Sequence, residues 1–139
     1  MSTTISTTNN VLRARSKQIT LTDSAQIYAN QAGSEINIAT DAKVITLPLI
    51  DANNLGMEFT IRNTGAAGNN IVTIAPNAAD GFNGSITQAA AIGSASGAVD
   101  KDLINTKATA LSGDFVIVKA IALTKWFITS GQGIWASQS

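Results

Sequence analysis

The sequence predicts an all-β fold, a jelly-roll-like antiparallel β-sandwich with an extended N-terminal arm. Three observations lead to this prediction. Hydrophobic residues recur with a period of two, clusters of Asn, Asp, Gly and Ser separate the short apolar runs, and no helical pattern is longer than about two turns. Many short strands with frequent turns are typical of a sandwich or a barrel rather than of βαβ units.

The length of 139 residues corresponds to one ordinary domain. Apolar residues make up 45% of the chain, which is enough to form a single hydrophobic core. We therefore expect one sandwich domain over residues 19–139, preceded by an extended arm over residues 1–18.

The first part of the chain contains four short candidate strands, at 19–21, 26–28, 35–39 and 43–47. In the third of these, Ile36 and Ile38 alternate with polar residues, so both isoleucines are expected to face the core. Turn-forming residues lie between the candidates, for example Gly33 and Ser34.

Four longer candidate strands follow, at 57–61, 71–74, 114–123 and 125–130. In the first, Met57, Phe59 and Ile61 face one side and polar residues the other, which indicates a half-buried strand. Trp126 and Phe127 are adjacent in one strand and therefore point to opposite faces, and we assign Trp126 to the core. The expected core residues of these strands are Phe59, Ile61, Val72, Ile74, Val116, Val118, Trp126 and Ile128.

The segment 76–108 interrupts this regular spacing because it is rich in Ala, Gly, Ser and Asn. A structureless loop of that length is uncommon inside a compact domain. The segment therefore either holds weak strands, around 85–87 and 103–104, or is an excursion shaped by a partner.

The composition excludes several classes of function. The chain contains no Cys and no His, so disulfides, thiolate nucleophiles and imidazole bases are absent and a zinc site is not expected. Net charge is zero and aromatic residues make up only 5%, which argues against a nucleic-acid partner. We expect a protein without enzymatic activity, cofactor or metal. Its low charge favours association, so we expect a homo-oligomer, either a trimer or a dimer.

The arm and the body carry opposite charges. Residues 1–22 contain Arg13, Arg15 and Lys17 and no acid, a charge of +3, whereas the rest holds 9 − 3 = 6 basic and 9 acidic residues, a charge of −3. In an extended arm the three cations face one side. They either contact a partner chain or form a solvated edge that discourages aggregation. Trp135 has either an intersubunit or a core-closing role.

The sequence shows no sign of membrane targeting. No run of about 18 apolar residues is present, so no membrane partner is expected. Residues 1–10 lack the basic and apolar regions of a secretory signal, and we expect a protein that acts inside a cell or leaves it by lysis.

The order of the strand motifs carries a family resemblance. The motifs are ITLP at 45–48, GMEFTIRN at 56–63, IVTIA at 71–75, GFNG at 81–84, GDFVIV at 113–118 and KWFI at 125–128. Their succession resembles the small β-sandwich virion proteins of tailed bacteriophages, which include capsid decoration (cement) proteins and tail-fibre domains. Two features depart from the pattern: segment 85–108 is longer, and residues 122–124 stand where a Gly/Asn turn is usual.

The resemblance carries no catalytic residues and implies a structural function. It implies a decoration protein on the outer capsid surface of the virion, made in the host cytoplasm, that bridges neighbouring subunits of the major capsid protein. The alternative is a tail-fibre, tail-spike or other tail-associated domain that is trimeric and faces a receptor. For either function the residues expected to contact a partner are Arg13, Arg15, Lys17 and Trp135.

Overall fold

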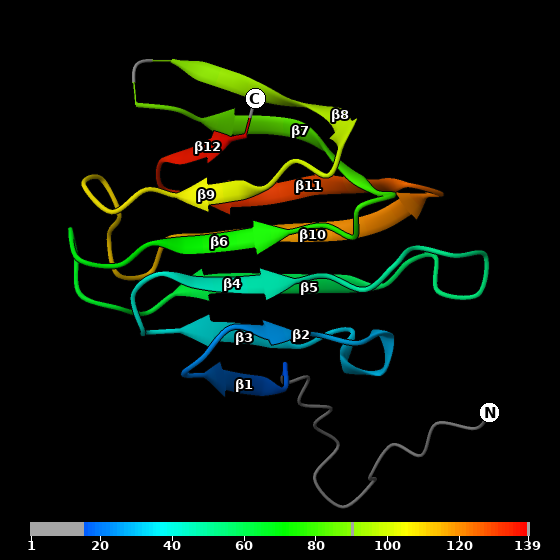
Figure 1. The fold of residues 1–139 in the computed structure, drawn as a ribbon, viewed down its shortest axis with the longest axis horizontal. Helices are drawn as coiled ribbons and strands as arrows, with labels where there is room; N and C mark the ends of the chain where they lie inside the picture. The colour runs from blue at the N-terminus through cyan, green and yellow to red at the C-terminus, as the bar shows by residue number, and fades with distance from the viewer. Residues whose placement is uncertain (1–15, 90, 139) are drawn as a thin grey trace, which may run out of the picture.

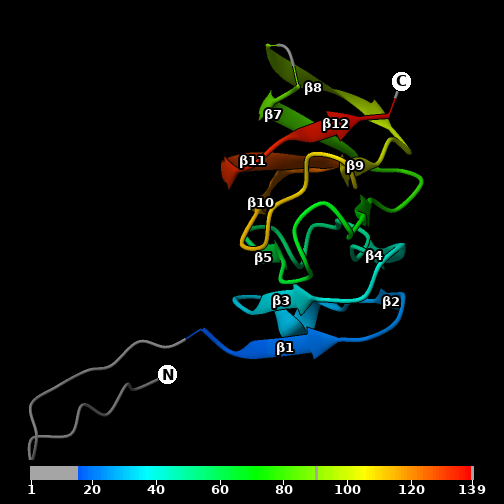
Figure 2. The same ribbon diagram turned by 90° about the vertical axis from the view of Figure 1, so that its left-hand side faces the viewer.

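The computed structural model describes residues 16–89 and 91–138, which form two β-sheets packed face to face (Figures 1 and 2). The prediction of an all-β sandwich is confirmed. One sheet has seven strands in the order β1-β3-β5-β10-β11-β7-β8, and the other has five in the order β12-β9-β6-β4-β2.

Within the described ranges the elements follow in chain order, with one 3-10 turn, η1, after the second strand. Their bounds are β1 Gln18–Leu21, β2 Ala25–Gln26, η1 Ala29–Gln31, β3 Glu35–Ile38, β4 Lys43–Thr46, β5 Glu58–Asn63, β6 Val72–Ala75, β7 Gly81–Thr87, β8 Ile92–Val99, β9 Leu103–Asn105, β10 Phe115–Ala122, β11 Lys125–Gln132 and β12 Trp135–Ser137.

The first six strands form a coil in which the chain alternates between the two sheets. Strands β1, β3 and β5 lie side by side in the larger sheet and β2, β4 and β6 in the smaller one, and all four of these pairs are parallel. The register stacks Ile19, Ile36 and Ile61 in one column on the inner face. We call β1–β6 the N-terminal coil.

The remaining strands are mostly antiparallel. Strands β7 and β8 form one hairpin and β10 and β11 another, while β9 lies between β6 and β12. The one parallel pair in this half joins β11 to β7. The prediction of an antiparallel, jelly-roll-like sandwich is therefore wrong in its strand directions, because five of the ten pairs are parallel. A period-two pattern fixes which face a residue occupies but not which strand lies next to it.

The core lies between the sheets. Seven of the eight predicted core residues are buried, and the eighth, Ile128, is partly buried against the core. Phe59 of β5 and Trp126 of β11 pack with their ring centroids 6.0 Å apart. Trp126 and Phe127 point to opposite faces as predicted, with Trp126 in the core.

The segment 76–108 contains three strands, β7, β8 and β9. The first two extend the larger sheet beyond β11, and the third joins β6 and β12 in the smaller sheet. Of the two interpretations offered for this segment, the structure shows the strands, and two of them occupy the expected places around 85–87 and 103–104.

Candidate functional site

The predicted contact residues occupy different environments. Lys17 is exposed, and its carbonyl oxygen accepts a 2.8 Å hydrogen bond from the Glu35 N–H, so the chain already follows β3 at this point. Arg13 and Arg15 lie outside the described residues. Trp135 is only 2% exposed, and its indole N–H donates to the Gln132 carbonyl at 3.0 Å. Trp135 thus stands in the core-closing position, with little surface left for a partner.

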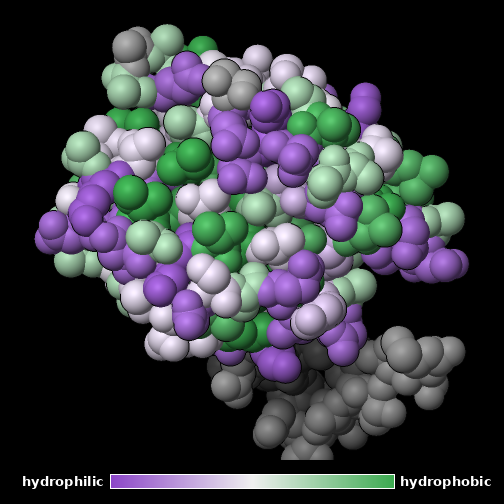
Figure 3. Space-filling view, viewed as in Figure 1, coloured by the Kyte–Doolittle hydropathy of each residue, from purple (hydrophilic) through white to green (hydrophobic). Residues whose placement is uncertain are grey.

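Five large hydrophobic side chains gather at one end of the sandwich and form the candidate contact surface. Their exposed fractions lie between 47% and 55%, and we call them the apolar rim: Leu49, Leu55, Val99, Ile121 and Leu123. They belong to the β4–β5 connection, the end of β8, and the end of β10 with the turn that follows it, which lie at the right of Figure 1. Hydrophobic residues reach the surface at the same end in Figure 3.

Backbone hydrogen bonds hold these three segments against one another. The Gly56 N–H donates to the Ala120 carbonyl at 2.7 Å, which places Leu55 and its connection beside the end of β10. The Gly81 N–H donates to the Thr124 carbonyl at 2.9 Å, and Gly81 pairs with Val99 across the β7–β8 hairpin. The segments that bear the rim residues are therefore hydrogen-bonded to one another through their backbones and are not independent loops.

A buried carboxyl group, Asp80, anchors the base of the rim. Its Oδ2 accepts a 2.9 Å hydrogen bond from the Ile50 N–H, and its carbonyl oxygen accepts one of 3.0 Å from the Asp100 N–H. Asp80 is fully buried, and its Oδ1 has no hydrogen-bond partner among the residues that the structure describes. Burial raises the pKa of Asp80, and the hydrogen bond from Ile50 opposes part of that rise.

A second, polar surface lies on the outer face of the larger sheet. Arg62 of β5 forms an ion pair with Glu35 of β3, and its guanidinium stacks 4.6 Å from the ring centroid of Phe115 of β10. The hydrogen bond from Arg62 is the main reason that the pKa of Glu35 is lowered. Asn37 and Gln18 extend this network to β1 through a 2.8 Å hydrogen bond. These contacts connect β1, β3, β5 and β10 across the outer face of the sheet.

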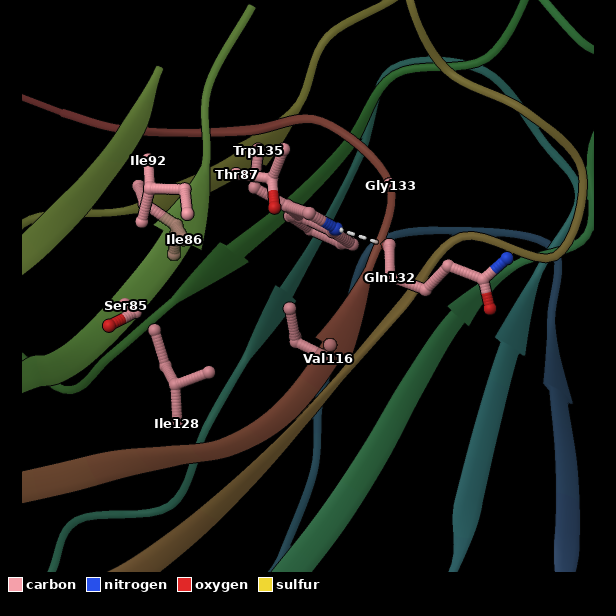
Figure 4. A pocket seen from close by; sticks show the side chains of 10 residues that line it. Ser85, Ile86, Thr87, Ile92, Val116, Ile128, Gln132, Gly133 and Trp135 are labelled. Carbon is pink, nitrogen blue, oxygen red and sulfur yellow. Dashed lines mark hydrogen bonds between the residues drawn. The ribbon is translucent and has the colours of Figure 1, made fainter.

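A cavity of about 240 Å³ lies between the β7–β8 hairpin and the strands β10, β11 and β12 (Figure 4). The side chains of Ile86, Ile92, Val116, Ile128 and Trp135 surround it in the close-up. Its other lining residues are Ser85, Thr87, Gly131, Gln132 and Gly133, and none of the ten is charged. The cavity is thus an apolar hollow with hydroxyl and amide groups at its margin.

Within residues 16–89 and 91–138, no three Asp or Glu side chains come close enough together to hold a metal ion. The same residues include no helix of the length and hydrophobicity needed to span a membrane.

The chain has no match among protein-family models, and a search of curated proteins finds no matching relative. The function is therefore inferred from the surface of the molecule itself.

Sequence reasoning missed the apolar rim and its anchor. Leu49 and Leu55 stand beside Asn, Asp and Gly residues that mark a turn, and turns are usually read as solvated connections. A signal was present, because Leu49 and Leu55 lie within or beside a largely polar turn segment, and Leu123 stands where a Gly/Asn turn is usual. Asp80 gave no signal, since nothing in its sequence neighbourhood distinguishes a buried aspartate from an exposed one.

Proposed function

We propose that the protein is a non-enzymatic capsid decoration (cement) protein of a tailed bacteriophage. It binds the outer capsid surface and bridges neighbouring major coat subunits, which stabilises the shell. The observation that carries the proposal is the apolar rim, and the strand motifs that resemble phage virion proteins support it. Large exposed hydrophobic side chains that are grouped together mark sites of protein contact.

The construction of the rim suits repeated binding to a rigid lattice. The segments that carry Leu55, Val99 and Leu123 are held by backbone hydrogen bonds and by the buried Asp80, so little conformational freedom is lost when they bind. Standard protein interfaces bury roughly 1,600 Å² in total. Five large side chains would form the apolar centre of such an interface, with polar residues around it.

Binding to empty shells assembled from the cognate major coat protein tests the proposal. The single variants Leu55→Asp and Leu123→Asp should reduce co-sedimentation with the shells by about tenfold or more, because each places a charge in the centre of the contact. Leu111→Asp is the matched control. Leu111 is 59% exposed but precedes the start of β10, whereas the rim lies at the end of that strand.

Two results would overturn the proposal. One is wild-type protein that does not bind the shells, and the other is rim variants that bind as well as the wild type. Thermal melting of each variant shows whether it is folded before its binding is compared.

A tail-associated protein is the second candidate, and the N-terminal coil favours it. Coils in which successive strands stack in parallel are the building principle of elongated β-solenoids, where each turn buries its apolar face against the next. Copy number in the purified particle separates the two candidates, since hundreds of copies indicate decoration of the shell and tens or fewer indicate the tail.

A further inference from the structure

Strand β8 is an open edge of the seven-stranded sheet. Among residues 16–89 and 91–138 it pairs only with β7, and it is the outermost strand of that sheet at the top of Figures 1 and 2. An edge strand presents a row of unpaired N–H and C=O groups that bind another strand. We propose that β8 pairs in antiparallel fashion with β8 of a second copy, so that two seven-stranded sheets become one continuous sheet in a two-fold symmetric dimer. This inference does not depend on the proposed function.

The edge at β8 lacks the protection that the other three edges have. Proteins protect edge strands by making them short, by placing charges or Pro on them, or by covering them. Strand β8 has eight residues, from Ile92 to Val99, and none of them is charged or Pro. By contrast, β2 has two residues and β12 three, and β1 has four residues flanked by Lys17 and Asp23.

The first five residues of β8 are regular enough to template a new strand. They pair in unbroken register with β7, from Ile92 opposite Thr87 to Ser96 opposite Asn83. The register shifts only beyond Ser96, where Gly97 has a φ of +78°. A bulge of this kind ends regular pairing, which confines the contact to residues 92–96.

The residues of β8 are suited to pairing with themselves. In a two-fold antiparallel pair centred on Ser94, Gly93 lies opposite Ala95 of the second copy, and Ile92 lies opposite Ser96 of the second copy. No like charges meet, because the strand has none and the whole chain has a net charge of zero. The pair also covers Ile92, which at 80% exposure is the most exposed large hydrophobic residue in the described part of the chain.

The apolar cavity lies beside this edge and adds to the contact. Ile92 and Ile86 both line it, so a second copy placed along β8 would stand next to its opening. A partner strand that covers this opening removes apolar surface from water in addition to forming backbone hydrogen bonds. The edge and the cavity thus belong to one contact region.

Sedimentation velocity of the full chain over a series of concentrations tests the dimer. We expect the wild type to dimerise and Ser94→Lys to raise the dimer dissociation constant by at least about fivefold, because the two lysines face each other across the two-fold axis. Ser130→Lys is the matched control, since Ser130 is an exposed serine of β11, an inner strand of the same sheet, and does not line the cavity. This control should dimerise like the wild type.

Amide hydrogen exchange of the wild type gives a second readout that does not rely on any variant. Amides within 92–96 should exchange more slowly at high protein concentration than at low concentration, while those of β12 should not change. A wild type that stays monomeric at millimolar concentration refutes the proposal, as does a dimer that persists in Ser94→Lys. Equal weakening by Ser130→Lys would mean that the copies associate through the sheet face and not through the edge.

Discussion

The side-chain amide of Asn63 donates a 2.7 Å hydrogen bond to Oδ1 of Asn105, and this bond crosses the core from one sheet to the other. Asn63 ends β5 in the larger sheet, Asn105 ends β9 in the smaller one, and both are buried. The Asn105 amide in turn donates to Oδ2 of Asp114 and to the Ile134 carbonyl, each at 3.0 Å. This buried network fixes how the two sheets are placed relative to each other, because each bond requires its partner in one position.

Asn105→Ala should lower the free energy of unfolding by about 3 kcal/mol, since it removes the hydrogen bonds that Asn105 forms with Asn63, Asp114 and the Ile134 carbonyl in buried surroundings. Urea denaturation followed by tryptophan fluorescence measures the change. The control is Asn37→Ala, which removes a hydrogen bond on the outer face and should cost about 0.5 kcal/mol or less. Equal losses for the two variants would contradict a special contribution from the buried network.

Phe59→Ala should lower the free energy of unfolding by about 3–5 kcal/mol, because it opens a cavity next to Trp126. The control is Phe127→Ala, since Phe127 lies on the outer face of the same sheet and is only partly buried. That variant should cost about 1 kcal/mol. A reversed order of the two losses would show that the faces of β5 and β11 have been assigned wrongly.

The raised pKa of Asp80 gives the protein a stability component that decreases as pH rises. The folded state holds this proton more tightly than the unfolded chain, so the component is full below the unfolded pKa near 3.8 and is lost as pH rises through the raised folded pKa. Asp80→Asn cannot titrate and should remove this decrease. Unfolding free energies of both proteins from acid to neutral pH measure it, and parallel curves would contradict the assignment.

Glu35 should show the opposite dependence on pH. The hydrogen bond from Arg62 lowers its pKa in the folded state, so its stabilising effect is present above the unfolded value of 4.5 and is lost as pH falls through the lowered folded pKa. Glu35→Gln should therefore lose stability relative to the wild type at neutral pH, by about 1 kcal/mol or less for this partly exposed pair. At strongly acidic pH the difference should disappear. A difference that does not change with pH would rule out the ion pair as its source.

Gly133 tests how closely the backbone must approach the buried network. It has a φ of +94°, and a Cβ atom at this position would overlap the carboxyl group of Asp114. Gly133→Ala should cost about 2–4 kcal/mol, from left-handed strain and overpacking together. Gly113→Ala is the matched control, because Gly113 has a φ of +103° with open space around it. It should cost only about 1 kcal/mol, and chemical denaturation compares the two.

The proposed contact role of the N-terminal arm remains a prediction. Deletion of residues 1–15 should leave the melting temperature nearly unchanged and weaken binding to capsid shells. Deletion of residues 1–21 should in addition lower the melting temperature, because it removes β1 and its pairs with β3. A large loss of stability in the shorter deletion would show that the arm supports the fold itself.

The sequence predicted correctly which side chains of a strand face the core, but it did not predict which strands pair with one another. Alternating apolar residues placed Phe59, Ile61 and Trp126 in the core, because burial on one side of a strand leaves a direct mark on the sequence. Parallel pairing leaves no such mark, since Ile19, Ile36 and Ile61 are separated by unequal stretches of chain and meet only after the chain has crossed to the other sheet and back. Strand β8 gave no signal either, because Gly, Ser and Ala have little strand preference and β7 supplies its template.

The candidate site was the least predictable part. Of the four residues proposed for partner contact, Trp135 is buried in the core and Lys17 is exposed beside β3. The apolar rim depends on three segments that are distant in sequence and meet only in the fold. Its anchor, Asp80, owes its importance to burial, which the sequence does not encode locally.

The alternation of the N-terminal coil between the sheets also determines the order in which the molecule can assemble. The β10–β11 hairpin closes through a two-residue turn and needs only local encounters, which take microseconds in small hairpins. Two strands of the coil can pair only after the chain between them has crossed to the other sheet and back. The entropy of closing that loop is therefore lost before the contacts between the strands compensate for it. The β10–β11 hairpin can therefore act as the folding nucleus. The strands of the N-terminal coil are synthesised before this hairpin but are among the last to pair.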